Sequence, residues 1–193
     1  MVELSRSNGS QFGLTIAGGT DKDSRPRICD LKPGSIAHRS DELQIGDMIM
    51  SINGIKTQGL KHEEIIDLIK NAGDALCLEF EYNLPPWPIH PHHAVRSQTV
   101  HIQLEKENNS YGFTIRGGSY EDKLKARPLI VTNIRAGGAA DREGTLKIGD
   151  RIIAINGINV INASLQEANF IIKQCKGLTL FLVEYDSAIV GGF

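Results

Sequence analysis

The sequence is poor in the features that place a chain in a membrane or outside the cell. It has no run of about 18 apolar residues, and its start, MVELSRSNGS, lacks the apolar core of a signal peptide. It has only three cysteines, Cys29, Cys77 and Cys175, all in apolar strand-like or helix-like settings. This odd number argues against a disulfide framework and predicts reduced, buried thiols in a cytosolic protein.

An excess of charge of one sign is also absent, and so are catalytic motifs. The formal net charge of -2 gives no basic field that would attract nucleic acid or an anionic membrane. The chain contains no G-x-S-x-G, P-loop or H-E-x-x-H sequence. Three linker histidines, His90, His92 and His93, lack a partner cluster at metal-ligand spacing. We therefore expect no enzyme activity, no cofactor and no metal.

What the sequence does contain is one unit that occurs twice. The stretch QFGLTIAGG at 11–19 returns as SYGFTIRGG at 110–118, IGD at 45–47 returns at 148–150, and INGI at 52–55 returns at 155–158. The separation between matched blocks grows in small steps along the chain, as short loop insertions would cause. The repeat predicts two homologous domains and not a solenoid.

Each unit reads as a series of short strands with one good amphipathic helix late in its sequence. Asn53-Gly54 and Asn156-Gly157 lie between apolar stretches and predict type I′ hairpin turns. The expected strands are 2–6, 12–19, 26–31, 47–54 and 75–82, then 99–105, 111–118, 128–134, 150–157 and 178–185. The expected long helices are 62–73 and 165–177, and shorter helical turns are expected at 35–40 and 138–143.

This pattern predicts a mostly β fold, α+β by count, with two partly open barrels of five to six strands and two helices each. The expected domains are 1–83 and 99–186, with a Pro-rich linker at 84–98 and a C-terminal tail at 187–193. Four prolines between Pro85 and Pro91 make the linker extended. Two readings stay open for Trp87: it packs onto a domain and fixes the mutual orientation of the units, or it stays in solvent.

The repeated loop suggests a binding site for a chain end. In QFGL and SYGF, bulky residues flank a glycine just before a strand, so that backbone N–H groups can converge on an anion beside an apolar pocket. An anion attached to an apolar side chain is what the last residue of a polypeptide presents. An extended peptide can then add as a further strand along the groove between the edge strand and the late helix.

QFGL and SYGF resemble the carboxylate-binding loop of PDZ domains, and the IGD, INGI and late-helix blocks match that family too. The blocks ICDLKPGSIAHRSDELQIGD, LKHEEIIDLIKNAG and GGAADREGTLKIGDRI are most similar to the opening PDZ pair of glutamate-receptor-interacting scaffold proteins. The resemblance implies a peptide-binding groove in each unit. In the first unit its residues are Phe12, Gly13, Leu14, Thr15, Ile16, His62, Ile66 and Ile69. In the second they are Tyr111, Gly112, Phe113, Thr114, Ile115, Lys106, Leu165, Asn169 and Ile172.

The two grooves are expected to differ in preference. By resemblance, His62 reads the residue two before the end of the ligand, and its imidazole favours Ser/Thr-X-aliphatic tails. Leu165 has the corresponding place and favours hydrophobic-X-hydrophobic tails. PDZ domains often carry a cation four residues before the loop; Lys106 fits that place, whereas the first unit has Ser7 there and Arg6 one residue away.

The resemblance implies a non-enzymatic cytoplasmic scaffold. Its expected partners are C-terminal tails of transmembrane receptors, such as glutamate and ephrin-type receptors, or of cell-surface matrix proteins. These would recruit it to membranes, synapses or cell junctions. Two alternatives stay open: only the first groove works while the second unit braces it, or the chain joins domains through surfaces outside the grooves. Phe193 is either a disordered terminus or the end of a tail that docks in a neighbouring copy.

Overall fold

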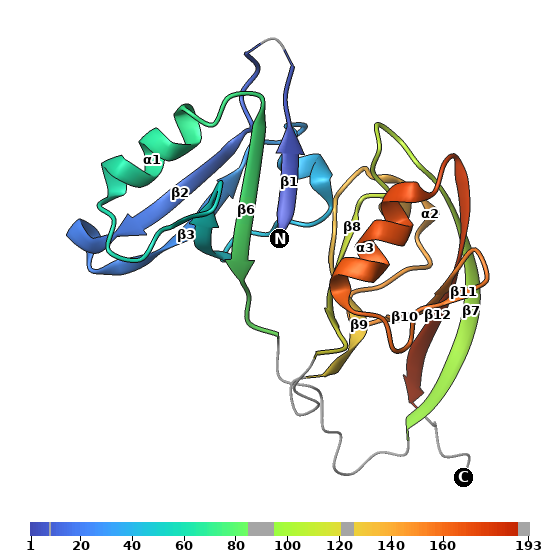
Figure 1. The fold of residues 1–193 in the computed structure, drawn as a ribbon. Coiled ribbons are helices and arrows are strands. Elements are labelled where there is room, and N and C mark those ends of the chain that lie inside the picture. The colour runs from blue at the N-terminus through green and yellow to red at the C-terminus, as the bar shows by residue number, and fades with distance from the viewer. Residues whose placement is uncertain (8, 85–94, 121–125, 189–193) are drawn as a thin grey trace. The chain divides into compact units, whose positions relative to one another are not determined.

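The computed structural model describes residues 1–7, 9–84, 95–120 and 126–188, and it divides into two compact units, Met1–Asn83 and Leu84–Phe193 (Figure 1). Trp87, Pro85 to Pro91, the linker histidines and Phe193 lie outside the described residues. No helix in the described part is both long and apolar enough to cross a membrane. The same residues contain no group of three or more His, Cys, Asp or Glu side chains suited to hold a metal ion.

The first unit is a six-stranded antiparallel sheet with one long helix. Its strands occur in the order β1-β6-β4-β3-β2, and β5 pairs with β4. The helix α1 lies beside β2, the edge strand of the sheet (Figure 1). The elements are β1 Val2–Ser5, β2 Leu14–Gly19, η1 Thr20–Lys22, β3 Ser24–Leu31, η2 His38–Ser40, β4 Met48–Ile52, β5 Ile55–Lys56, α1 His62–Lys70 and β6 Ala75–Glu81.

The second unit repeats this topology with the order β7-β12-β10-β9-β8, and β11 pairs with β10. Its elements are β7 Val95–Glu105, β8 Phe113–Gly118, β9 Arg127–Ile134, α2 Ala139–Glu143, β10 Arg151–Ile155, β11 Ile158–Asn159, α3 Leu165–Gln174 and β12 Leu178–Ala188. Each unit has its own core, formed by the alternate inward side chains of the strands and one helix face, with Ile65 of α1 and Ala168 of α3 fully buried. The predicted fold class is confirmed.

The second unit carries a longer terminal strand pair than the first. β7 and β12 pair over 11 residues, from Leu178 opposite Glu105 to Ala188 opposite Val95. The strand therefore begins inside the segment expected to be linker. Arg151 fixes this pair, since its side chain is only 9% exposed and its guanidinium contacts Glu184 and Asp186, both at 2.6 Å. These two carboxylates hold the pKa of Arg151 above its usual range.

Local sequence signals hold at the turns but not at the cysteines. Asn53 and Gly54 have φ values of 48° and 80°, and Asn156 and Gly157 have 47° and 80°, as type I′ turns require. The cysteines are free, as expected. The prediction that they are buried is wrong, because Cys29 is exposed and the other two are only half-buried. Cys29 lies at an irregularity of the β2–β3 pairing, where the strict alternation of faces is lost.

Candidate functional site

The loop before β2 leaves backbone donors unused in the first unit. Its carbonyl groups are bonded: the Phe12 oxygen accepts from the Ala37 amide at 3.0 Å, and the Gly13 oxygen accepts from the Lys32 amide at 2.8 Å. Among the described residues, the Phe12 and Gly13 amides donate to no acceptor. Adjacent N–H groups of this kind form an anion-binding concavity.

Gly13 is required by the shape of this loop. Its φ is +78°, a conformation that side chains disfavour, and a Cβ built on it would lie 2.1 Å from the Cβ of Ser35. The Ser35 hydroxyl also donates to the Gly13 oxygen at 3.2 Å. The loop is thus held against the segment that follows β3.

A hollow of about 400 Å³ opens beside these amides, between β2 and α1. It brings together most of the first-unit residues predicted from the sequence, with Phe12 and Leu14 from the loop and β2 and two isoleucines from α1. The lining residues are Arg6, Gln11, Phe12, Gly13, Leu14, Thr15, Asp30, Lys32, Ile66, Ile69 and Lys70. Ile16 does not line it, because its side chain is 3% exposed and belongs to the core.

His62 lies farther along the groove, at the start of α1. Its Nδ1 is 2.9 Å from the carbonyl oxygen of Gly18, and its backbone N–H donates to the Asp21 carboxylate at 2.7 Å. This hydrogen bond to the His62 amide lowers the pKa of the Asp21 carboxyl group. Gly19 permits the close approach, since a Cβ there would lie 2.5 Å from the His62 nitrogen. The glycine pair at the end of β2 therefore allows the helix to begin against the strand.

Arg6 supplies the cation that the sequence lacks at Ser7. Its Nε donates to the Gly73 oxygen at 2.6 Å and its Nη1 to the Ser10 oxygen at 3.2 Å. Its guanidinium carbon is 4.5 Å from the centre of the Phe12 ring. All three contacts place a positive charge at the mouth of the hollow without a carboxylate partner in the described part of the chain.

The corresponding strand of the second unit is covered. Residues 111–118 are all buried, whereas Thr15 is exposed in β2. Phe181 packs edge to face against both Tyr111 and Phe113, with ring centres 5.3 and 5.4 Å apart. The Tyr111 hydroxyl is 2.5 Å from the Thr179 hydroxyl, and burial raises the pKa of the tyrosine. Thr114 and Ile115, also predicted site residues, are each 2% exposed.

The Gly112 amide of the second loop already has an acceptor inside the unit. The Gly112 amide donates to the Ser110 hydroxyl oxygen at 3.0 Å, and Arg135 donates to the same oxygen at 2.5 Å. Ser110 is 1% exposed. The Ser110 hydroxyl lies next to the Gly112 amide, in the place that the carboxylate of a bound tail would need.

Lys106 is directed to the end of α3. Its ammonium group donates to the carbonyl oxygens of Ile172, Lys173 and Cys175 at 2.8, 3.1 and 2.8 Å, and it lies 5.2 Å from the centre of the Tyr111 ring. A lysine at this end of a helix satisfies its last carbonyl groups. Lys106, which the resemblance implies as a cation for ligand binding, therefore hydrogen-bonds to the end of α3 within its own unit.

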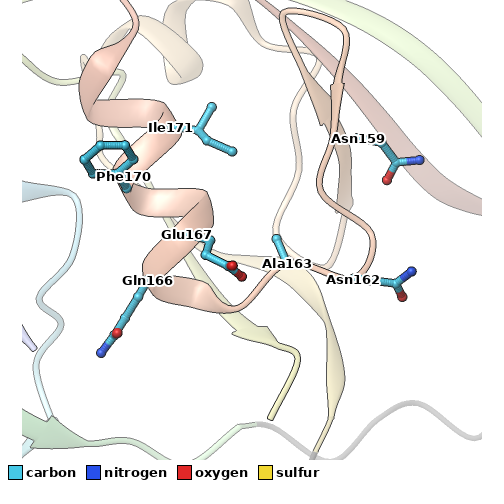
Figure 2. Close-up of a pocket in the computed structure, with 7 residues that line it drawn as sticks. All are labelled: Asn159, Asn162, Ala163, Gln166, Glu167, Phe170 and Ile171. Carbon is cyan, nitrogen blue, oxygen red and sulfur yellow. The ribbon is translucent and has the colours of Figure 1, made fainter. Parts of the chain in front are cut away.

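The predicted residues on α3 are half-buried. Leu165 and Ile172 pack against the core, and Asn169 lies between them on the helix. A larger hollow of about 860 Å³ lies at the other side of this helix, lined by Asn159, Asn162, Ala163, Gln166, Glu167, Phe170 and Ile171. In Figure 2, Ile171 points from the helix toward β11, which carries Asn159. This hollow contains none of the residues predicted for the second groove.

Sequence reasoning missed Lys32, Lys70 and the Ser110–Arg135 contact. Lys32 follows β3 and Lys70 ends α1, and neither belongs to a motif, so only the fold brings them to the hollow. Ser110 differs in sequence from its counterpart in the first unit, Gln11, and this difference is the only sign that the sequence gives of the contact.

The fold and the first loop together define a protein-interaction domain that occurs twice. The PDZ domain model matches residues 1–81 and 99–183, so the chain belongs to the PDZ family. It is 50% identical over 190 residues to glutamate receptor-interacting protein 2 of Xenopus laevis and 46% identical over 190 residues to glutamate receptor-interacting protein 1 of Rattus norvegicus. It is 30% identical over 208 residues to multiple PDZ domain protein of Mus musculus.

These matches cover 98%, 98% and 94% of this chain but only 18%, 17% and 10% of the three relatives. The chain therefore spans less than a fifth of the curated relatives that it matches. Over this length the chain is a tandem pair of PDZ domains.

Proposed function

We propose that the first unit binds free C-terminal tails of membrane proteins by adding them as a strand to β2. The observation that carries this proposal is the pair of amides of Phe12 and Gly13, which donate to no acceptor among the described residues and lie beside a hollow with Leu14, Ile66 and Ile69 in its wall. The amides suit a terminal carboxylate, and the apolar wall suits an aliphatic last side chain. The Arg6 guanidinium adds a positive charge at the same mouth.

The strength of such binding is modest. Each main-chain hydrogen bond of an added strand contributes about 0.5–1.5 kcal/mol, and burial of the last side chain contributes about 1.5–3 kcal/mol. After the cost of ordering the tail, a free energy near -8 kcal/mol, or a micromolar Kd, is expected. Reversible capture of this strength fits an adaptor.

His62 supports a preference for Ser/Thr-X-aliphatic tails. A carbonyl oxygen only accepts hydrogen bonds, so the contact with Gly18 requires the proton on Nδ1. In the neutral ring the Nε2 atom then has a lone pair and accepts from a serine or threonine hydroxyl. The position of this acceptor beyond the hollow suits the residue two before the tail's end.

We further propose that the second unit braces the pair, with its own groove closed. Its Gly112 amide and Lys106 ammonium are engaged within the unit, and β8 is buried along its length. The preference of Leu165 for hydrophobic-X-hydrophobic tails applies only if this groove opens. Glutamate receptor-interacting proteins 1 and 2 are named for interaction with glutamate receptors, which supports receptor tails as partners at the cytoplasmic side of membranes such as synapses.

Titration of the 193-residue chain with a labelled peptide ending Thr-X-Val tests this function. Anisotropy should show micromolar binding that is lost when the peptide's C-terminus is amidated, because the amide has no negative charge for the loop. Equal binding of the two peptides would contradict the proposal. For the brace, each unit expressed alone should melt at a lower temperature than the joined chain.

A further inference from the structure

Positive charge collects around the hollow of the first unit. Arg6, Lys32 and Lys70 line it together with a single carboxylate, that of Asp30. Within the described ranges none of these four side chains forms an ion pair. Arg6 and Lys70 lie on the side of α1, where Arg6 reaches Gly73 just beyond the helix. Lys32 lies on the opposite side, directly after β3.

The strand pairing fixes the direction of Lys32. Leu14 lies opposite Leu31 and Thr15 opposite Asp30, and the Lys32 amide donates to the Gly13 oxygen. Side chains alternate between the two faces of a sheet, and paired residues share a face. Lys32 and Asp30 are therefore on the exposed face with Thr15, and not on the face of the apolar pocket.

Lys32 lies beside Gly13 at the loop end of the strand pair, whereas Asp30 lies opposite Thr15. Gly13 has no side chain, and a Cβ built there would lie 3.5 Å from the Lys32 Cβ and 2.1 Å from the Ser35 Cβ, so Ser35 fills the space directly over Gly13. The flexible four-carbon stem of Lys32 can extend past Ser35 toward an added strand. Asp30 has a short side chain, and the Thr15 side chain stands between it and the tail.

A tail that adds to β2 alternates in the same way. Its last residue and the residue two before it face the pocket and His62, so its penultimate residue faces the side of Thr15 and Lys32. Building on the function proposed above, we infer that the Lys32 ammonium group contacts the side chain of this penultimate residue. The first unit would then favour tails with glutamate or aspartate at that position. The second unit has no equivalent reader, since Arg135, which follows β9, donates to Ser110.

The test uses the 193-residue chain and three labelled peptides that end Thr-Glu-Val, Thr-Gln-Val and Thr-Lys-Val. At low salt the glutamate tail should bind about threefold tighter than the glutamine tail, the range of a partly exposed ion pair, and the lysine tail should bind weakest. Lys32→Gln should bring the glutamate and glutamine tails to equal affinity. Lys56→Gln, a loss of the same charge on β5 outside this hollow, should leave the ratio unchanged.

Several outcomes would overturn the assignment. Equal affinities in the parent chain, tightest binding of the lysine tail, or a ratio that survives Lys32→Gln each contradict it. If the difference in affinity between the glutamate and glutamine tails disappears in Lys70→Gln but not in Lys32→Gln, the residue that contacts the penultimate side chain is Lys70 at the end of α1. In all of these cases binding still requires the free carboxylate, so the proposed function stands. Only if none of the three tails binds in a carboxylate-dependent way does that function fail.

Discussion

His62 and Gly18 are joined by a hydrogen bond of 2.9 Å between Nδ1 of the imidazole and the carbonyl oxygen of Gly18 in β2. The carbonyl oxygen dictates the tautomer, and the tautomer dictates which ring nitrogen remains to accept from a ligand. A backbone group of β2, the strand proposed to receive the tail, thus sets the chemistry of the residue proposed to contact the tail two residues before its end. In the second unit Leu165 begins the corresponding helix, and no ring nitrogen is available there.

The first prediction concerns this residue. His62→Ala should weaken binding of a Thr-X-Val tail about tenfold, which corresponds to one lost hydrogen bond of about 1.4 kcal/mol. His62→Leu should lower affinity for the threonine tail in the same way and raise that for a tail with valine in its place. Anisotropy titrations with both peptides measure the two changes. Glu63→Ala, on the exposed side of the same helix turn, is the control. Unchanged threonine preference in both variants would refute the role of His62.

The second prediction concerns the cation at the loop. Arg6→Gln should weaken all tails with a free carboxylate about three- to tenfold, whatever residue faces His62, because it removes charge near the terminal carboxylate. Arg27→Gln, an exposed arginine of β3 outside the hollow, serves as the matched control. Comparison of free and amidated peptides measures the effect. A loss of affinity that is the same for amidated tails would assign Arg6 to loop structure instead.

The elements that the sequence predicted are those that depend on near neighbours. The Asn-Gly turns, the strand ends at glycine pairs and the two late helices follow from conformations that few other residues adopt. Asn53 and Gly54 illustrate the reason, because their positive φ values are ones that these two residue types tolerate whatever the rest of the chain does.

Contacts between distant residues were not predictable in the same way. Lys106 reaches the end of α3, and Arg135 reaches Ser110, through side-chain directions that no local pattern encodes. The exposure of Cys29 depends on a single irregular pair in β2–β3. The loops QFGL and SYGF look alike in sequence. They differ because the Gly112 amide of the second loop already donates to the Ser110 hydroxyl.

A third prediction tests the closed loop of the second unit. Ser110→Ala removes a buried oxygen that accepts from Gly112 and Arg135, and it should lower the free energy of unfolding by about 1–3 kcal/mol. Urea denaturation measures this change. Ser119→Ala, half-buried after β8 and without a side-chain hydrogen bond in the described part of the chain, should change stability by less than about 0.5 kcal/mol. Equal stability of the two variants would remove Ser110 as a structural acceptor.

The fourth prediction concerns the carboxylate that holds the start of α1. The hydrogen bond from the His62 amide lowers the pKa of Asp21 below its ordinary value of 3.8. Because the folded-state pKa is the lower one, Asp21 contributes stability above pH 3.8, and this contribution is lost as the pH falls through the folded value. The melting temperature of the parent chain should therefore fall more steeply between about pH 5 and pH 3 than that of Asp21→Asn.

The same variant links stability to binding. At neutral pH, Asp21→Asn should weaken a Thr-X-Val tail about threefold, because the neutral amide is a weaker acceptor for the His62 N–H and α1 is held less firmly against β2. Asp23→Asn is the matched control: it lies two residues along the same turn, its φ of 47° is one that asparagine also tolerates, and it does not line the candidate groove. Parallel melting curves for the parent chain and Asp21→Asn across this pH range would show that the carboxylate does not anchor the helix.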